Sequence, residues 1–242
     1  MSSSFSRHSS GSAGVSKRQR AAEIDATVAI EDYVKAIYSL QHGREELVST
    51  SALAERLGVT AGSASGMVRK LDGLGLVDHV PYRGVVLTPL GRRLALEVLR
   101  HHRLLELYLS ETFGMPWEEV HAEADVLEHV LSEELEDLIA AKLGDPTVDP
   151  HGDPIPGRDG SIDEPETRAL ADLLPGDRGL LMRVSDSDPD MLRYLAERKI
   201  RPGQPVEVTG KQPFGGAIFV RIAGAEHVLG GALARAMRVG QG

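Results

Sequence analysis

The pattern of hydrophobic and polar residues divides the chain into a helical first part and a β-rich end. Apolar residues recur every three or four positions from Thr27 to about residue 42, which predicts an amphipathic helix. A shorter helix over 52–57 and a second helix over 60–74 follow, each after a Ser or Thr cap, with a turn at Gly58 between them. This succession predicts a helix-turn-helix.

The segment after the second helix has the pattern of a β-hairpin. Two β-branched runs, over 76–80 and 85–87, flank a Pro-Tyr-Arg-Gly turn that places Arg83 at the tip. A helix-turn-helix followed by such a hairpin predicts a winged helix.

Three further helices are predicted before the chain becomes β-rich, at 89–113, 116–129 and 132–143. Proline and glycine are then dense over 144–164, which indicates an irregular connector. The β-rich end holds one helical insert at 190–199 and short apolar runs at 180–184, 205–208, 218–220 and 227–229. About sixty residues of this kind predict a small SH3-like barrel.

The fold class predicted from these elements is mainly α with small β parts. It combines an N-terminal winged helix-turn-helix, a helical domain and a C-terminal SH3-like β-barrel. The predicted boundaries are a disordered basic tail at 1–25, the winged helix-turn-helix at 26–95, the helical domain at 96–150, a linker at 151–177 and the SH3-like domain at 178–242.

Charge is unevenly distributed along the chain. The net charge is −9, and residues 104–150 hold 13 acidic residues against one basic residue. So acidic a block favours bound cations, whereas the mildly basic front half suits an anionic partner. The chain has no cysteine, no long apolar run and no secretory signal pattern, so we expect a cytoplasmic protein without a membrane span.

Histidines and carboxylates in the acidic block have the spacing of metal ligands. His102 and Glu106 are four residues apart, as are His121 and Asp125, and Glu128 and His129 complete an i, i+3, i+4 set with Asp125. Such residues share one face of a helix. Nitrogen and oxygen ligands suit manganese, iron(II) or zinc. The alternative is a solvated acidic face with incidental histidines.

The second helix of the helix-turn-helix is the candidate DNA-reading element. Small and polar residues at its start allow close approach to DNA, and basic residues follow them. The candidate DNA contacts are Thr60, Gly62, Ser63, Ser65, Arg69, Lys70 and, on the wing, Arg83. A helical hairpin that binds no nucleic acid is the alternative. Lys17, Arg18 and Arg20 form a further basic cluster, which either touches phosphates or is solvated.

Four stretches carry a family resemblance: I-E-D-Y-V-K-A-I-Y-S-L, Y-R-G-V-V-L-T, P-W-E-E-V-H-A-E-A and H-G-D-P-I-P-G. Over residues 27–160, and loosely over 178–240, the chain resembles the metal-dependent repressors of the diphtheria toxin repressor type. The first two stretches resemble the manganese transport regulators, and the last two resemble the actinobacterial iron regulators. The resemblance implies that 26–95 binds DNA and that 96–150 binds metal and forms a homodimer.

The resemblance also implies two metal sites per subunit. One would use His102, Glu106 and His121, completed by Asp188 and Met191 of the SH3-like domain. The other would use Asp32, Asp125, Glu128 and His129. Iron regulators have Met and Cys where this chain has Asp32 and Asp125, and hard oxygens at those positions favour manganese. Lys35 stands where two-domain manganese regulators have a glutamate, which departs from their binuclear arrangement.

The sequence therefore predicts a manganese-activated homodimeric repressor of metal homeostasis that binds a near-palindromic operator. An iron(II)-dependent repressor of the same architecture is the first alternative. A metal hydrolase is the second, although the chain shows no nucleophile motif. A metal-independent winged-helix regulator is the third.

Overall fold

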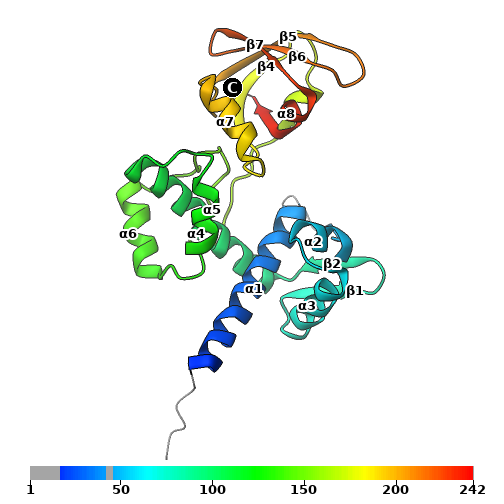
Figure 1. Ribbon diagram of the computed structural model, residues 1–242, viewed down its shortest axis with the longest axis vertical. Helices are drawn as coiled ribbons and strands as arrows, with labels where there is room; N and C mark the ends of the chain where they lie inside the picture. The colour runs from blue at the N-terminus through cyan, green and yellow to red at the C-terminus, as the bar shows by residue number, and fades with distance from the viewer. Residues whose placement is uncertain (1–16, 42–45, 242) are drawn as a thin grey trace, which may run out of the picture.

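A computed structural model describes residues 17–41 and 46–241 and shows three units. Two helical units lie side by side, and a β-rich unit sits above them (Figure 1). No helix in the described ranges combines the length and apolarity needed to cross a membrane.

The first unit is the predicted winged helix-turn-helix. Its elements are α1 (Lys17–Gln41), α2 (Thr50–Arg56), α3 (Ala61–Gly73), β1 (Val77–Val80) and β2 (Gly84–Leu87). Ser49 caps α2 and Thr60 caps α3, each through its side-chain oxygen. β1 and β2 pair antiparallel, and Leu53, Val68 and Leu71 are fully buried between the helices. Burial of these apolar faces holds α3 at the surface of the unit.

The first helix corrects one boundary. α1 begins at Lys17, ten residues before the predicted start at Thr27, so 17–25 is helical and not a disordered tail. The prediction relied on apolar periodicity, which these added residues, KRQRAAEIDA, do not show. They form a helix because most of them have a high intrinsic helix propensity. Residues 1–16 and 42–45, including the predicted stop at His42-Gly43, lie outside the described residues.

Helix α4 (Pro89–Phe113) is shared by the two helical units. Its first half packs in the core of the winged helix through Leu96 and Leu99, and its second half packs in a separate core through Leu104 and Leu105. Gly91 is needed where α4 passes the wing, because a Cβ there would lie 1.9 Å from the carbonyl oxygen of Leu76. One continuous helix thus connects the two units.

The second unit adds α5 (Val120–Leu127) and α6 (Glu133–Leu143) to α4. α6 begins at the Ser132 cap, as predicted. α5 is shorter than predicted, because it ends at Leu127 with Glu128 as its C-terminal cap residue. His129 therefore lies in the turn that follows α5 and not on its helical face.

The third unit is a six-stranded antiparallel sheet in the order β3-β8-β4-β5-β6-β7. Its elements are β3 (Thr167–Ala169), η1 (Leu170–Asp172), β4 (Arg178–Val184), α7 (Pro189–Glu197), β5 (Pro205–Lys211), β6 (Ile218–Ile222), β7 (Ala225–Leu229), α8 (Gly231–Ala236) and β8 (Met237–Gly240). β3 lies inside the predicted linker 151–177, and Leu170 and Leu173 of that segment are buried in the core of this unit. The linker prediction failed there because β3 is short and is stabilised only by pairing with the distant β8.

The connector after α6 docks onto the third unit and is not free. The His151 carbonyl oxygen accepts a hydrogen bond from the Val184 amide at 2.9 Å. A Cβ on Gly152 would lie 1.9 Å from the Met182 carbonyl oxygen. Trp117 of the second unit is buried within the core of the third. These contacts bring the loop between β4 and α7 to the metal-ligand candidates.

Candidate metal centre and nucleic-acid interface

Four side chains converge where α4, α5 and the third unit meet; we call this group site A (His102, Glu106, His121 and Asp186). His102 Nε2 lies 3.0 Å from Glu106 Oε1 and 3.0 Å from His121 Nδ1. His121 Nδ1 lies 3.1 Å from Glu106 Oε1 and 3.1 Å from Asp186 Oδ2. His102 and Glu106 are buried, so the group is closed to bulk solvent on the α4 side.

These separations fit an octahedral metal ion. Adjacent ligands around an ion with bonds of about 2.1 Å lie about 3.0 Å apart, since the octahedron edge is √2 times the bond. The donors are imidazole nitrogens and carboxylate oxygens, a set that suits manganese, iron(II) and zinc. Site A therefore has the donors and the spacing that the sequence assigned to His102, Glu106 and His121.

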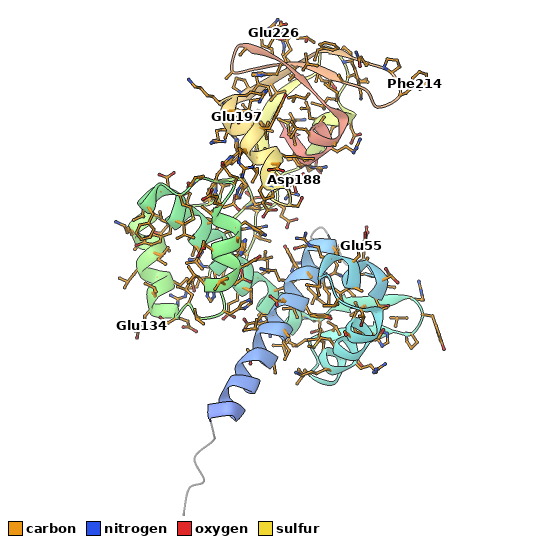
Figure 2. The ribbon with its side chains drawn as sticks, in the orientation of Figure 1. Glu55, Glu134, Asp188, Glu197, Phe214 and Glu226 are labelled. Atoms are coloured by element: carbon orange, nitrogen blue, oxygen red, sulfur yellow. The ribbon has the colours of Figure 1, made fainter. Side chains whose placement is uncertain are left out.

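Asp186, and not Asp188, is the carboxylate of the third unit that reaches site A. Asp188 is the N-cap of α7, where its Oδ1 accepts hydrogen bonds from the amides of Asp190 and Met191. Figure 2 shows Asp188 at the end of α7 that faces the second unit. Met191 packs against the apolar core of the third unit. A cap is fixed by its own helix, which the S-D-P-D spacing could have indicated.

Asp186 and Asp188 are only two residues apart, yet replacing them should have different effects on Mn²⁺ affinity. Asp186→Ala removes one of four donors and should weaken Mn²⁺ binding at site A about 10- to 100-fold. Asp188→Ala should leave Mn²⁺ affinity unchanged and cost about 1 kcal/mol of stability through loss of the cap. Titration calorimetry and thermal unfolding measure both quantities. Equal loss of Mn²⁺ affinity in the two variants would contradict the assignment.

Charges in site A are mutually stabilised. Hydrogen bonds to Asp186 and Glu106 raise the pKa of His121 to about 10. Burial alone would lower the pKa of His102, but hydrogen bonds to Glu106 and Glu128 outweigh it and raise the pKa to about 9. Burial opposes ionisation of Asp186, yet the hydrogen bond from His121 keeps the pKa of this carboxyl lowered. The site is thus built for a positive charge among carboxylates.

A second group, Asp32, Glu128 and His129, joins α1 to the turn after α5. Asp125, the fourth predicted ligand, shares a group with Glu128 and His102 instead. We call the four predicted ligands Asp32, Asp125, Glu128 and His129 site B. His129 Nε2 lies 3.2 Å from Asp32 Oδ1 and 3.4 Å from Glu128 Oε1. The other ring nitrogen of His129 lies 2.6 Å from Glu31 Oε2, a contact that fixes the ring. Glu128 is fully buried although it follows the end of α5. Site B therefore connects the winged helix to the second unit through side chains.

Lys35 places an ammonium group inside site B. Its Nζ lies 2.6 Å from Glu128 Oε1 and 2.9 Å from Asp125 Oδ1. Burial favours the neutral forms, but the ion pair lowers the pKa of Asp125 and raises that of Lys35. Burial raises the pKa of Asp32, and the His129 and Lys35 charges only partly offset this effect. The two carboxylates nearest Lys35 already have a cation partner.

The two sites touch through His102. Its Nδ1 lies 2.6 Å from Glu128 Oε2 in site B, while its Nε2 belongs to site A. Asp125 also lies between the sites, with Oδ1 3.4 Å from His102 Nδ1 and Oδ2 3.6 Å from His121 Nε2. The sequence spacing gave these residues but not the shared ring of His102.

A third group of buried candidate ligands was not predicted from the sequence. Glu106, Asp149 and His151 offer ligand atoms within 4.8 Å of one another, and all three are buried. Burial raises the pKa of Asp149 well above its usual range. The D-P-H-G-D stretch indicated only an irregular connector, although its histidine and two aspartates were a signal for ligands.

The candidate DNA-reading residues lie at the surface of the first unit. Six of them are exposed and Ser65 is partly exposed, the exposed set being Thr60, Gly62, Ser63, Arg69, Lys70 and Arg83. Thr60 and Ser63 are joined by a 2.9 Å hydrogen bond between their hydroxyls at the start of α3. Tyr82 at the wing tip is fully exposed with a φ of 63°, so the tip projects from the unit.

Comparison with known proteins matches the three units in order. The N-terminal DNA binding domain of iron dependent repressors matches residues 25–85, their metal binding and dimerisation domain matches 88–157, and the FeoA domain matches 168–240. The iron-dependent repressor IdeR of Mycobacterium tuberculosis is 35% identical over 213 residues, covering 82% of this chain and 90% of that protein. The chain belongs to the iron-dependent repressor family. The family includes the diphtheria toxin repressor of Corynebacterium diphtheriae, which is 34% identical over 193 residues and covers 75% of this chain and 84% of that protein.

Solved structures agree with this membership. A manganese-dependent transcriptional repressor in complex with manganese has a TM-score of 0.82 at 46% identity, covering 88% of this chain and 99% of that chain. The IdeR of T. acidophilum has a TM-score of 0.71 at 28% identity, covering 88% and 97%. The chain is thus a metal-dependent DNA-binding repressor, which confirms the predicted fold and class. The hydrolase and metal-independent alternatives are wrong.

Proposed function

We propose that this repressor is activated by Mn²⁺, which it binds at sites A and B of each subunit, and that it acts on DNA in the cytoplasm to control metal homeostasis. The observation that carries the proposal is the ligand chemistry. Site B offers carboxylates at Asp32 and Asp125 in place of soft sulfur donors, and site A offers only oxygen and nitrogen. Hard donors of this kind favour manganese. Measuring operator binding with Mn²⁺ and with iron(II), in chelator-treated anaerobic buffer, tests the choice.

Site B supplies the regulatory link. Asp32 belongs to α1 of the DNA-binding unit, whereas Glu128 and His129 belong to the second unit. A metal ion held by these residues would favour one placement of α1 against the second unit over others. If DNA binds this placement more tightly than other placements, bound metal raises the affinity for DNA. By reciprocity, bound DNA raises the affinity for metal.

DNA recognition would use α3 of each subunit in a homodimer. The two helices would address the half-sites of a near-palindromic operator, with the wing residue Arg83 on the backbone. Exposure of the α3 start and of Arg69 and Lys70 supports this role. Apolar side chains exposed on the second unit, including Val126, Val130 and Leu138, provide surface for the dimer.

Ser63→Glu should weaken operator binding by at least about tenfold, because it adds a negative charge to the surface that would face phosphates. Ala225→Glu is the matched control, since it adds the same charge next to Glu226, at the far end of the third unit (Figure 2). Fluorescence anisotropy at saturating Mn²⁺ measures both. Unchanged affinity of Ser63→Glu would show that α3 does not face DNA.

Lys35 should act as a competitor for metal at site B. A metal ion that uses Glu128 and Asp125 must share or displace the ammonium that now contacts both. Lys35→Gln should therefore raise Mn²⁺ affinity at site B about tenfold, because it removes a nearby positive charge. It should also lower the stability of the metal-free protein, since Glu128 stays buried without its partner.

Lys142→Gln on α6 is the control for Lys35→Gln, because Lys142 is exposed and outside both sites. Calorimetric titration with Mn²⁺ and thermal unfolding with and without the ion give the two readouts. Weaker Mn²⁺ binding in Lys35→Gln than in Lys142→Gln would mean that Lys35 supports the site and does not compete with the ion.

The iron(II) alternative has support from the relatives, since IdeR of Mycobacterium tuberculosis is named an iron-dependent repressor. The manganese complex at 46% identity supports the proposal instead. Both belong to one architecture, so the discriminating feature is the donor at positions 32 and 125.

A further inference from the structure

Behind site A lies a buried pair of acceptor atoms that the two proposed sites do not use. Glu106 Oε1 belongs to site A, but Glu106 Oε2 points away from it and lies 3.7 Å from His151 Nδ1. Of the buried side-chain atoms in the described residues, these two have no hydrogen-bond partner. Both residues are fully buried, so bulk water does not reach the gap between them.

The contact of the other ring nitrogen of His151 determines which nitrogen carries the hydrogen. His151 Nε2 lies 2.7 Å from the carbonyl oxygen of Trp117. A carbonyl only accepts, so Nε2 must carry the hydrogen. In the neutral ring, Nδ1 then presents a lone pair toward a carboxylate oxygen. Two buried acceptors that face each other are unfavourable unless a cation or a proton lies between them.

Asp149 adds a third ligand residue, and a second carboxylate, to the gap. Its Oδ1 accepts hydrogen bonds from the amides of His151 and Asp153, which hold the carboxylate in place. Its Oδ2 lies 4.0 Å from Arg103 Nε, beyond hydrogen-bond distance. Glu106 and Asp149 are therefore two buried carboxylates with one unpaired imidazole nitrogen beside them, a donor set of the same hard type as site A.

We propose that Glu106, Asp149 and His151 hold a third divalent cation, with the Glu106 carboxylate bridging it to the ion of site A. The separation of 3.7 Å between Glu106 Oε2 and His151 Nδ1 is below the limit of about 4.2 Å, twice a bond of about 2.1 Å, so both atoms can bind one ion. The inference rests on the proposed function, because it assumes that Glu106 also serves site A.

The position of this cation gives it a role in domain docking. The loop that carries Asp149 and His151 contacts the third unit through Val184 and Met182. The His151 ring also stacks on Trp117, at 5.5 Å between centroids, and Trp117 is buried in the core of the third unit. An ion here would strengthen the docking that brings Asp186 to site A, so filling of the two sites is expected to be mutually favourable.

The test is to locate and count Mn²⁺ in the full chain. Crystals grown with Mn²⁺ alone, measured at the manganese absorption edge, should show an anomalous peak beside Glu106 Oε2 in addition to peaks at sites A and B. Native mass spectrometry should find one Mn²⁺ fewer per subunit in His151→Gln than in the wild type. Glutamine keeps an N–H that can donate to the Trp117 carbonyl but lacks the Nδ1 donor.

Two further variants make the count specific. Asp149→Asn keeps an oxygen for the amides of His151 and Asp153 but removes the negative charge, and it should also lose one Mn²⁺. His227→Gln, on β7 of the third unit, should keep the wild-type count. Thermal unfolding of the metal-free variants checks that they fold. If a variant does not fold, the anomalous map of the wild type decides the question by itself.

A wild-type map without a peak beside Glu106 Oε2, or equal counts in the wild type and both site variants, would overturn the inference. A proton on His151 would then join the two atoms. Peaks missing at sites A and B would instead overturn the proposed function, so the two failures are distinguishable.

Discussion

His129→Ala is expected to abolish Mn²⁺-activated operator binding, with a loss of at least about 100-fold in affinity, whereas Asp186→Ala should reduce it less. His129 holds site B together, because its ring contacts Asp32 of α1 and Glu128 of the second unit. Losing this ring would remove the donor that contacts both Asp32 and Glu128, and so would weaken the link between the two units. Asp186 closes site A from the third unit, where its loss affects docking of that unit more than the placement of α3.

The structure also decides which variant compares the sites cleanly. His102→Ala would not test site A alone, because His102 contacts Glu128 at 2.6 Å and so touches both sites. Asp186 has its ligand contact with His121 alone, which confines its effect to site A. Anisotropy with labelled operator at saturating Mn²⁺ measures both variants. A larger loss in Asp186→Ala would place the switch at site A and reverse the roles of the two sites.

Exchanging Asp32 for Met together with Asp125 for Cys should change the order of activation from manganese toward iron(II). Thioether and thiolate donors prefer softer ions, and affinity at a given donor set rises from manganese to iron(II). We expect the ratio of activating concentrations of the two ions to change by at least about tenfold. The double change also removes the partner of Lys35 at position 125 and leaves Glu128 as its contact.

Operator binding titrated with each ion under anaerobic conditions measures this ratio. Asp188→Asn is a suitable control, because it alters a carboxylate of the third unit that caps α7 and lies outside both sites. An unchanged order of activation in the double variant would mean that metal choice is set elsewhere, for instance at site A, and not by the donors at positions 32 and 125.

Local physics explains what could be predicted. Thr60, Thr88 and Ser132 each precede a helix, and each side chain accepts the amide hydrogen bond that a first turn leaves free. α4 accordingly begins and ends at the predicted residues. The gathering of candidate ligands from α4 and α5 was also predictable, since residues four apart on a helix lie on the same face.

Predictions failed where a residue depends on distant partners. β3 forms only because β8 pairs with it, and Glu128 and His129 point into site B although α5 has already ended. The helical spacing therefore pointed to residues that do gather near site B, although α5 ends at Leu127 and does not reach His129. Lys35 stood out in the sequence as a departure from relatives, but its contact with two buried-site carboxylates needed α1 and α5 to be packed together.

By itself the sequence determined the winged helix-turn-helix, the order of the three units and most of the side chains that gather as candidate ligands, because these follow from caps, periodicity and the chemistry of side chains. Only the tertiary structure decided that Asp186 and not Asp188 completes site A, that His102 serves two sites and that His151 faces Glu106. Each of these contacts brings together segments that are far apart in the sequence. The chain pattern fixes which side chains share a face of one helix, whereas the docking of units fixes which faces meet.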